Sequence, residues 1–405
     1  MRDIAWAQLP PVVRRILAAR AVRCVAQGIF SVDFVLYLAA RHWSAAAIGL
    51  MVSAITLGAA GLNLWGGTVT DRHGRRRYLL GYQVASIVLC AAIVVLHANW
   101  VLIAAAVLLG FGLGPNSALG PFAPAEQAWL AQNVAKAQRG RIFSLASAGG
   151  FIGMTVGSLM AALVPDVGYN LLFYTTIVMA AINFVQYAGL KEAPPEPVVD
   201  TGGGGERRAE NRNLMLLSIA NGVAGLGMGL FAQILPYWLS IRYGVGAAAI
   251  GPVFAIGYLA AAFSSVLTGE ASSRFGLVRA IVWARLLSIL ALIALPFMPT
   301  FSGAAVMYTL RSVLNRGTVG ARQAFSVNLV RDGRRGLAGS LNNLSQRLPS
   351  AIGPAVAGWM IGLGLLSLPL LLAAGLQLVY VGLFVRFFRN HDQLPAAQPA
   401  AAAER

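Results

Sequence analysis

Apolar stretches long enough to cross a membrane follow one another along almost the whole chain. A helix needs about 20 apolar residues to cross a bilayer. Twelve stretches come near this length, at residues 17–39, 46–69, 78–97, 101–122, 142–164, 168–189, 213–240, 247–269, 277–299, 302–323, 341–363 and 365–388. The sequence therefore predicts an all-α integral membrane protein with twelve transmembrane helices.

The composition fits a membrane protein and argues against a nucleic-acid-binding one. Of the 405 residues, 58% are hydrophobic and 11% are charged, whereas soluble domains carry about 25% charged residues. The net charge of +17 comes from 31 Lys and Arg against 14 Asp and Glu. Because the basic residues are scattered between apolar stretches, without a basic stripe that contains aromatic residues, we expect no nucleic-acid partner.

Most basic loop residues fall on one side of the predicted membrane. If every stretch crosses, the turn at 72–77 shares one side with the loops at 136–141 and 274–279, and the opposite loops hold only Arg41 and Arg242. Positively charged loops stay in the cytoplasm. The sequence thus predicts a multi-pass protein of the inner (plasma) membrane with both termini in the cytoplasm.

A polar segment divides the chain into two halves. Residues 191–212 combine prolines, four consecutive glycines and mixed charge, which is typical of a flexible linker. We expect an N-terminal six-helix bundle at 17–190 and a C-terminal six-helix bundle at 213–389. Residues 1–16 are expected to form a short interfacial helix on the cytoplasmic face, and residues 390–405 a cytoplasmic tail.

The two halves also carry a repeated sequence. Residues 45–49 and 247–251 both read Ala-Ala-Ala-Ile-Gly, at an offset of 202. The same offset relates a glycine-arginine framework in the first half to one in the second: Gly67, Arg72 and Gly74 to Gly269, Arg274 and Gly276. Two parallel six-span halves are the architecture of a transporter whose substrate site lies between the halves near the membrane midplane.

The junction between the second and third stretches carries a motif of glycines, an acid and arginines. It reads Gly-x8-Gly-x3-Asp-Arg-x-Gly-Arg-Arg, with fixed positions Gly58, Gly67, Asp71, Arg72, Gly74, Arg75 and Arg76. This motif resembles the one between spans two and three of the major facilitator superfamily, whose fold is two pseudo-symmetric six-helix bundles. The span count, the linker and the repeat extend the resemblance over the whole chain.

The resemblance implies a gating role for this motif. In the family, the Asp meets the N-terminal end of span eleven and the last Arg pairs with an acid at the end of span four. Asp71 would then be the helix-end acid, and an anion is favoured at a helix N-terminus. Glu126 is the one acid near the end of span four, so we expect an Arg75–Glu126 pair. The alternative is that the turn only anchors the topology.

Asp33 is the one acid that lies well inside a predicted span. An ionisable residue within a span is expensive and is functional by default, and burial disfavours the charged form of a carboxyl. Asp33 is therefore suited to exchange a proton or to bind a cationic substrate. The structural alternative is a permanently paired Asp that locks helices together.

Arginines are the expected partners of Asp33. Arg311 and Arg322 are eleven residues apart in the tenth span and share a helix face with Asn315. By resemblance, spans one, four, seven and ten line the cavity, so we expect Asp33 to contact Arg311 across it. Arg23, in the inner part of span one, is expected to extend its charged group to the membrane surface.

Five further polar residues are candidates for the cavity lining: Gln27, Asn116, Asn221, Gln233 and Tyr258. Each is equally a candidate for a hydrogen bond between helices. The four histidines fall in loops or at span ends, and the sequence contains no cluster of metal ligands and no phosphate-binding loop. We therefore expect no metal, no cofactor and no ATP hydrolysis within the chain.

Together these features predict a secondary transporter that works by alternating access, and not an enzyme. The first hypothesis is proton-coupled efflux of a small amphipathic or drug-like compound, with Asp33 as the proton carrier. The alternative is a carrier for an anionic organic metabolite, because arginines without acid partners attract carboxylate or phosphate groups. A transporter-like sensor or lipid-handling protein is a third hypothesis. The expected partners are the lipid bilayer, a small-molecule substrate and protons, and the chain is expected to be a monomer.

Overall fold

The computed structural model describes residues 9–112, 122–134, 138–190, 204–275, 277–317, 322 and 335–388. Side chains are described for these residues except at 67–68, 71–73, 123–124, 128, 131, 139–141, 204–209, 265–275, 277–278, 280, 317, 335–340 and 343. Every regular element in the described ranges is a helix, and no strand occurs in them. This confirms the predicted all-α fold class.

The helices of the first half follow the predicted stretches except at the fourth span, predicted at 101–122, where α4 ends at Leu109 and residues 113–121 lie outside the described ranges. They are α1 (Pro11–Ala40), α2 (Ala45–His73), α3 (Arg75–Leu96), α4 (Asn99–Leu109), α5 (Ala123–Gln132), α6 (Arg139–Ala161), α7 (Val164–Val167) and α8 (Asn170–Ala188). Proline suits the first position of a helix because its missing N–H has no partner there, and α1 begins at Pro11. Residues 11–16 therefore continue the first span, so the expectation of a separate interfacial helix is wrong for them; residues 1–8 lie outside the described ranges.

The second half contains more interrupted helices. They are α9 (Gly204–Gly229), α10 (Leu235–Tyr243), α11 (Ala247–Phe275), α12 (Leu277–Ala294), the short 3₁₀ helix η3 (Leu295–Phe297), α13 (Phe301–Gly317), α15 (Arg335–Ser350), α16 (Ile352–Gly362) and α17 (Leu368–Phe388). The predicted seventh span is divided between α9 and α10, and the eleventh between α15 and α16. α9 begins at Gly204, inside the segment predicted as a linker, and residues 191–203 lie outside the description.

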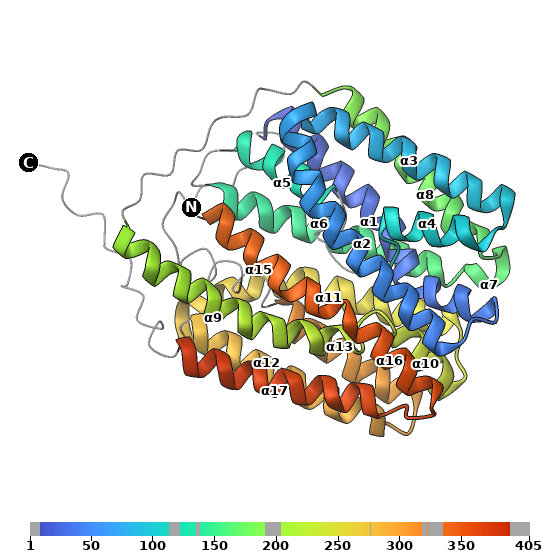
Figure 1. The fold of residues 1–405 in the computed structure, drawn as a ribbon. Coiled ribbons are helices and arrows are strands. Elements are labelled where there is room, and N and C mark those ends of the chain that lie inside the picture. Colours follow the sequence, from blue (N-terminus) through green and yellow to red (C-terminus); the bar gives the residue numbers. More distant parts are fainter. Residues whose placement is uncertain are drawn as a thin grey trace, which may run out of the picture.

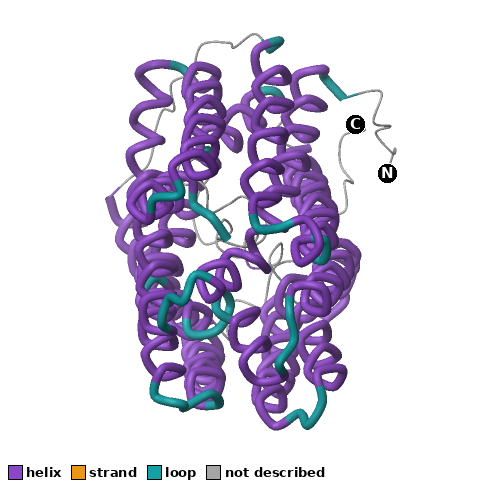
Figure 2. The backbone as a smooth tube through the Cα atoms, turned by 90° about the vertical axis from the view of Figure 1, so that its right-hand side faces the viewer, coloured by secondary structure: helices purple, strands orange, loops and turns teal. Residues whose placement is uncertain are grey.

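Figure 1 shows the two halves as two layers of helices, with α1 to α8 in one and α9 to α17 in the other. The first described residue, Leu9, and the last, Phe388, lie at the same end of the molecule, which we call the termini end. The opposite end, called the turn end, carries the turns at 41–44 and 244–246. Figure 2 shows the helices running along the axis that joins these ends. Among the described residues, seven helices are long and apolar enough to cross a membrane. Shorter or interrupted helices occupy the other predicted spans, as expected for a multi-pass membrane protein.

Equivalent helices pack closely at glycines within each half. A Cβ added at Gly157 of α6 would lie 2.0 Å from the carbonyl oxygen of Val25 in α1. A Cβ added at Gly225 of α9 would lie 2.0 Å from the carbonyl oxygen of Gln346 in α15. Span one thus packs on span five as span seven packs on span eleven. The predicted repeat is therefore present in the packing of both halves.

The repeated Ala-Ala-Ala-Ile-Gly sequence forms contacts between the halves. A Cβ at Gly49 of α2 would lie 2.3 Å from the Pro354 carbonyl oxygen in α16, and a Cβ at Gly251 of α11 would lie 2.5 Å from the Ser158 carbonyl oxygen in α6. Each copy of the sequence therefore places its glycine against the opposite half. Both contacts lie near the turn end, because each glycine is close to the start of its helix.

Three hydrogen bonds between the halves lie toward the turn end, as the glycine contacts do. They join the Ala355 amide to Ser53 Oγ (2.9 Å), the Tyr258 hydroxyl to Ser31 Oγ (3.1 Å) and Thr155 Oγ1 to the Ala255 carbonyl oxygen (3.5 Å). The donors and acceptors all belong to α1, α2, α6, α11 and α16. The two halves are consequently joined toward the turn end by small and polar residues.

Replacing Gly49 with valine is expected to separate the halves at the turn end, because the new side chain would meet the Pro354 backbone. The readout is a cysteine introduced at Ser53, a residue that is 7% exposed. In Gly49→Val protein this cysteine should react severalfold faster with a water-soluble maleimide. The native Cys24 and Cys90 are buried and give little background.

The matched control is Gly375→Val, since nothing lies within 4 Å of a Cβ added at Gly375. This variant should leave the labelling rate at position 53 unchanged. Equal labelling rates in the two glycine variants would show that the α2–α16 contact does not keep the turn end closed.

Candidate functional site

A buried ion pair joins α1 to α5 in the first half. The Arg23 guanidinium Nη2 lies 2.5 Å from Glu126 Oε2, and its Nη1 donates to the Tyr187 hydroxyl at 3.2 Å. The same guanidinium lies 3.7 Å from the centre of the Phe122 ring. Arg23 and Glu126 are 5% and 1% exposed. The expectation that Arg23 extends to the membrane surface is therefore wrong, because its charge is paired inside the bundle.

The arginines of the motif contact other partners. Arg75 donates to the side chain of Gln132 at the end of α5, and Arg76 donates to the carbonyl oxygens of Tyr187 and Ala188 at the end of α8. The expected Arg75–Glu126 pair is not formed. Glu126 lies in the first turn of α5 and faces α1, whereas Arg75 reaches the other end of α5. Arg76 provides the positive charge that is favoured at the C-terminus of a helix.

The glycines of the motif shape the junction between α2 and α3. Gly74 ends α2 with a φ of 86°, in the region that glycine adopts without steric cost. A Cβ at Gly58 would lie 2.5 Å from Val107 Cγ1 in α4. Gly67, Asp71 and Arg72 belong to α2, but their surroundings lie outside the described part of the chain. The expected contact of Asp71 with the start of span eleven therefore stays a prediction.

A small cavity is lined by Arg23 and by other residues of the first half. Its volume is about 30 Å³, room for one or two water molecules. Among its lining residues, Gln27, Gln83 and Asn183 each have a buried amide atom without a hydrogen-bond partner in the described residues. Gln27 thus lines a cavity among helices of the first half, and its expected place in a substrate cavity between the halves stays a prediction.

Asp33 of α1 is fully buried. Neither of its carboxylate oxygens has a hydrogen-bond partner within the described ranges. Aromatic side chains from α1 and its neighbours pack beside it, including Phe30 and Phe111, whose ring centres are 4.1 Å apart. Two residues away, Ser31 accepts the hydrogen bond from Tyr258 of the other half. Because residues two positions apart point to opposite sides of a helix, Asp33 does not share the face of α1 on which Ser31 meets the other half. A buried acid with no hydrogen-bond partner in the described residues therefore lies inside the first half.

The expected contact between Asp33 and Arg311 is absent. The Arg311 guanidinium lies 4.0 Å from the centre of the Phe231 ring and 3.9 Å from Met228 Sδ. Both neighbours belong to the second half, at the junction of α9 and α10. Sequence spacing gave the depth of Arg311 but could not show that its side chain points into its own half.

Four arginines of the second half form what we call the C-half arginine cluster: Arg285, Arg311, Arg316 and Arg322. Arg285 donates to Gln377 Oε1 at 3.3 Å and lies 5.2 Å from the Tyr380 ring centre. Arg316 lies 4.3 Å from the Tyr258 ring centre, and Arg322 donates to the Asn315 carbonyl oxygen. No carboxylate in the described part of the chain pairs with any of the four.

Aromatic contacts alone do not offset the burial of this charge. A cation–π contact contributes about 0.5–2 kcal/mol, whereas burying an ion costs several kcal/mol. Arg285 is 0% exposed and Arg311 is 5% exposed. The guanidinium groups of both residues therefore lose most of their hydration on burial. The cluster is therefore an electropositive centre that an anion would stabilise.

Sequence reasoning missed Arg285. It lies within the predicted ninth span, and a survey of bases inside spans would have found it as readily as the survey of acids found Asp33. The offset of 202 relates it to Gln83 of the first half, which is also buried and polar. The two halves thus place a polar side chain at the same position, with a charge in only one of them.

The other cavity candidates have mixed environments. The Asn221 amide donates to Asn342 Oδ1 at 2.9 Å, which is a helix–helix hydrogen bond between α9 and α15. Asn315 Nδ2 lies 3.7 Å from Met228 Sδ, beside Arg311. Gln233 is half-buried in the turn between α9 and α10. Asn116 lies outside the described residues, and the described ranges contain no cluster of potential metal ligands.

Glu126→Gln is expected to destabilise the protein strongly, because it leaves the Arg23 guanidinium buried without a counter-charge. Breaking one partner of a buried ion pair costs about 3–5 kcal/mol. Gln132→Ala, which removes the Arg75 hydrogen bond at a half-buried site, is the matched control and should cost much less. Thermal unfolding of both variants in detergent measures the difference. Equal losses of thermal stability in the two variants would mean that the Arg23–Glu126 pair stabilises the protein no more than the Arg75–Gln132 hydrogen bond does.

Comparison with known proteins relates the chain to membrane transporters. The family model of the Major Facilitator Superfamily matches residues 16–320 and 217–405. The multidrug resistance protein MdtH of Klebsiella pneumoniae (strain 342) is 31% identical over 134 residues, a match that spans 32% of this chain. The match likewise spans only 32% of the length of MdtH.

Several solved structures have the same fold. A bacterial homologue of the human lysosomal transporter Spinster, in an inward-facing and unoccupied conformation, has a TM-score of 0.71 at 16% identity and covers 98% of this chain and 100% of its own. A peptide transporter of the POT family, in an auto-inhibited form, has a TM-score of 0.75 at 12% identity, covering 96% and 99%. The nucleoside transporter NupG has a TM-score of 0.72 at 12% identity, covering 93% and 99%.

At these identities the structural likeness shows the fold alone. The family model, by contrast, matches segments that together extend from residue 16 to the last residue. The chain therefore belongs to the Major Facilitator Superfamily, and it is a membrane transporter and not an enzyme.

Proposed function

We propose that this transporter exports small amphipathic compounds in exchange for protons. The observation that carries the proposal is Asp33, which is 0% exposed and has no hydrogen-bond partner within the described residues. An isolated charged carboxylate is costly in a low-dielectric interior, so such a group neutralises or binds a ligand. Asp33 can therefore take up a proton in one conformation and release it in another.

The position of Asp33 supports coupling to the motion of the halves. Asp33 belongs to the same helix as Ser31, which accepts a hydrogen bond from Tyr258 across the interface, so a rocking motion that moves α1 against the other half would also move Asp33. Access of water to the carboxylate would then depend on the conformation. The partial similarity to MdtH, whose name describes multidrug resistance, is a second and weaker support for efflux.

We further propose that the termini end faces the cytoplasm of a cell with the protein in its inner membrane. The basic turn at Arg75–Arg77 lies at this end, and positively charged turns stay in the cytoplasm. The contacts of Gly49 and Gly251 at the turn end would then close the route to the outside. In this proposal residues 17–190 and 213–389 are the rocking halves of a monomer, and Asp71 and Arg72 contribute to the opposite, cytoplasmic gate.

The second candidate function is a carrier for an anionic organic metabolite, by uptake or exchange. The C-half arginine cluster favours it, because guanidinium groups bind carboxylate and phosphate groups strongly. The two candidates differ in the role of protons. Export coupled to protons depends on a proton gradient, whereas simple anion exchange does not.

Asp33→Asn is expected to abolish proton-coupled transport, because the amide resembles the neutral acid and cannot release its proton. The assay uses proteoliposomes with and without an imposed proton gradient, and anionic and cationic amphipathic dyes as trial substrates. Gradient-driven flux should fall at least about tenfold, the loss of one positioned proton-transfer group being worth about 10²–10⁴-fold. Exchange of dye against dye should persist.

The matched control is Asp166→Asn in α7, where the carboxylate is exposed and its neutralisation should leave the flux unchanged. If the Asp33→Asn protein retains the full gradient-driven flux, Asp33 is not the proton carrier. If flux of the unmodified protein does not respond to the gradient, the anion carrier becomes the better assignment.

A further inference from the structure

The C-half arginine cluster contains buried hydrogen-bond donors that have no acceptor among the described residues. Nε and Nη2 of Arg285, Nε of Arg311 and Nε of Arg322 are buried without a hydrogen-bond partner in the described part of the chain. Nε2 of Gln377, next to Arg285, is also unpartnered and the residue is 0% exposed. All of these atoms are donors. Their surplus matches a ligand that only accepts hydrogen bonds, as an anion does.

The members of the cluster are close enough to act on one ligand. Arg285 lies on α12, which packs against α13, the helix that carries Arg311. Arg311 Nη2 and Asn315 Nδ2 both lie near Met228 Sδ, at 3.9 and 3.7 Å, and Arg322 donates to the Asn315 backbone. Like charges repel one another at such sites unless an anion lies between them. The arrangement therefore favours binding of a group with at least one full negative charge.

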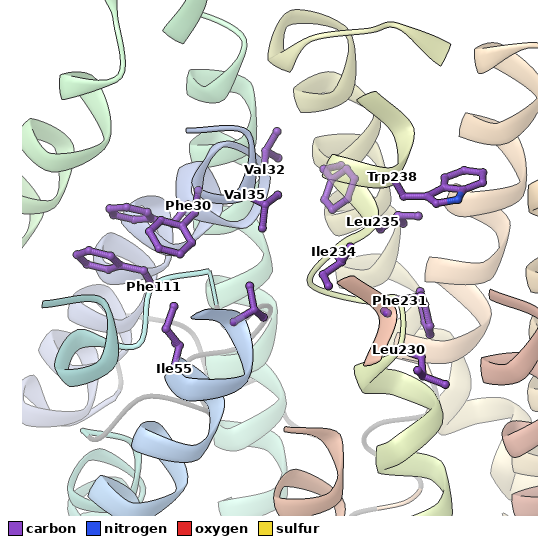
Figure 3. Packing of buried hydrophobic residues seen from close by; sticks show 14 of the residues in the cluster. Phe30, Val32, Val35, Ile55, Phe111, Leu230, Phe231, Ile234, Leu235 and Trp238 are labelled. Atoms are coloured by element: carbon purple, nitrogen blue, oxygen red, sulfur yellow. The ribbon is translucent and has the colours of Figure 1, made fainter. Parts of the chain in front are cut away.

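Apolar side chains of the second half adjoin the cluster. The Arg311 guanidinium lies over the Phe231 ring. Figure 3 shows Leu230, Phe231 and Ile234 on one side of the view and Val35 and Ile55 of the first half on the other. These residues belong to one buried apolar cluster that includes both halves. A ligand bound to Arg311 could therefore extend an apolar body between the halves.

We propose that Arg285 and Arg311, supported by Gln377 and Arg322, bind the anionic group of an amphipathic substrate, a carboxylate or a phosphate. This inference rests on the proposed export of amphipathic compounds and narrows the substrate class to organic anions. Asp33 lies outside this site, since it has no contact with Arg311. Proton and substrate would then occupy different halves.

Binding of octyl phosphate to the purified protein tests the site without any transport step. The protein is placed in nanodiscs of phosphatidylcholine, and equilibrium binding of radiolabelled octyl phosphate, octanoate, octyltrimethylammonium and octanol is measured. The two anions should bind about 10- to 100-fold more tightly than octanol, as expected for charged hydrogen bonds. The cation should bind no better than octanol.

Arg285→Gln and Arg311→Gln should each weaken binding of the two anions at least about tenfold and leave octanol binding unchanged. Arg285→Lys, which keeps the charge, should retain part of the affinity. Arg386→Gln is the matched control, because Arg386 is exposed at the end of α17. Octanol binding by each variant reports that the apolar part of the site is intact.

Anion binding that is unchanged in the Arg285→Gln Arg311→Gln double variant would overturn the proposal, as would equal affinities for octyl phosphate and octanol. Nanodiscs with phosphatidylglycerol test the other source of such a group. If this anionic lipid displaces octyl phosphate, the site belongs to a lipid headgroup and the assignment to a substrate is wrong.

This outcome is separable from that of the proposed proton coupling. Saturable anion binding together with gradient-independent flux would keep the anion site and reject proton-coupled export. Gradient-driven flux that depends on Asp33, together with binding that shows no preference for anions, would keep proton-coupled export and reject the anion site.

Discussion

Close backbone contact between helices at glycine is the interaction on which the arrangement of the two halves depends. Lipid tails are as apolar as the side chains of a membrane helix, so helices in a bilayer associate through packing and hydrogen bonds more than through the hydrophobic effect. Gly49 and Gly251, the two copies of one repeated position, each meet a helix of the opposite half. The sequence repeat is therefore also a repeat of the interface. Contacts of this kind are tight yet small in area, which suits halves that must separate and rejoin.

The second constraint is the cost of charge in a low-dielectric interior, and the two halves meet it differently. The first half pairs Arg23 with Glu126. The second half keeps its buried arginines beside aromatic rings and amides, with no carboxylate partner in the described residues. At the offset of 202 a neutral Gln83 corresponds to a charged Arg285. The halves have thus retained one fold and acquired different electrostatic characters.

Sequence reasoning succeeded where the signal was local and failed where it depended on side-chain direction. The span lengths, the two halves and the glycine framework follow from the spacing of apolar residues and from the repeat. The Arg75–Glu126 and Asp33–Arg311 pairs did not form, although their partners lie at the expected depths. Spacing along a helix gives depth in the membrane and the shared face of a helix. It does not give the rotation of that helix about its own axis. The sequence therefore does not tell which neighbouring helix a given face contacts.

The sequence by itself determined that this chain is a membrane protein, that it has two related halves and that one acid lies within its spans, because these properties depend on composition and period alone. Only the tertiary structure decided which charges meet. It placed Glu126 against Arg23, left Asp33 without a hydrogen-bond partner in the described ranges, and placed Arg311 against Phe231 and Met228 of its own half. The physical reason is that electrostatic energy depends steeply on separation at low dielectric, and separations between spans are set by helix packing that no single span encodes.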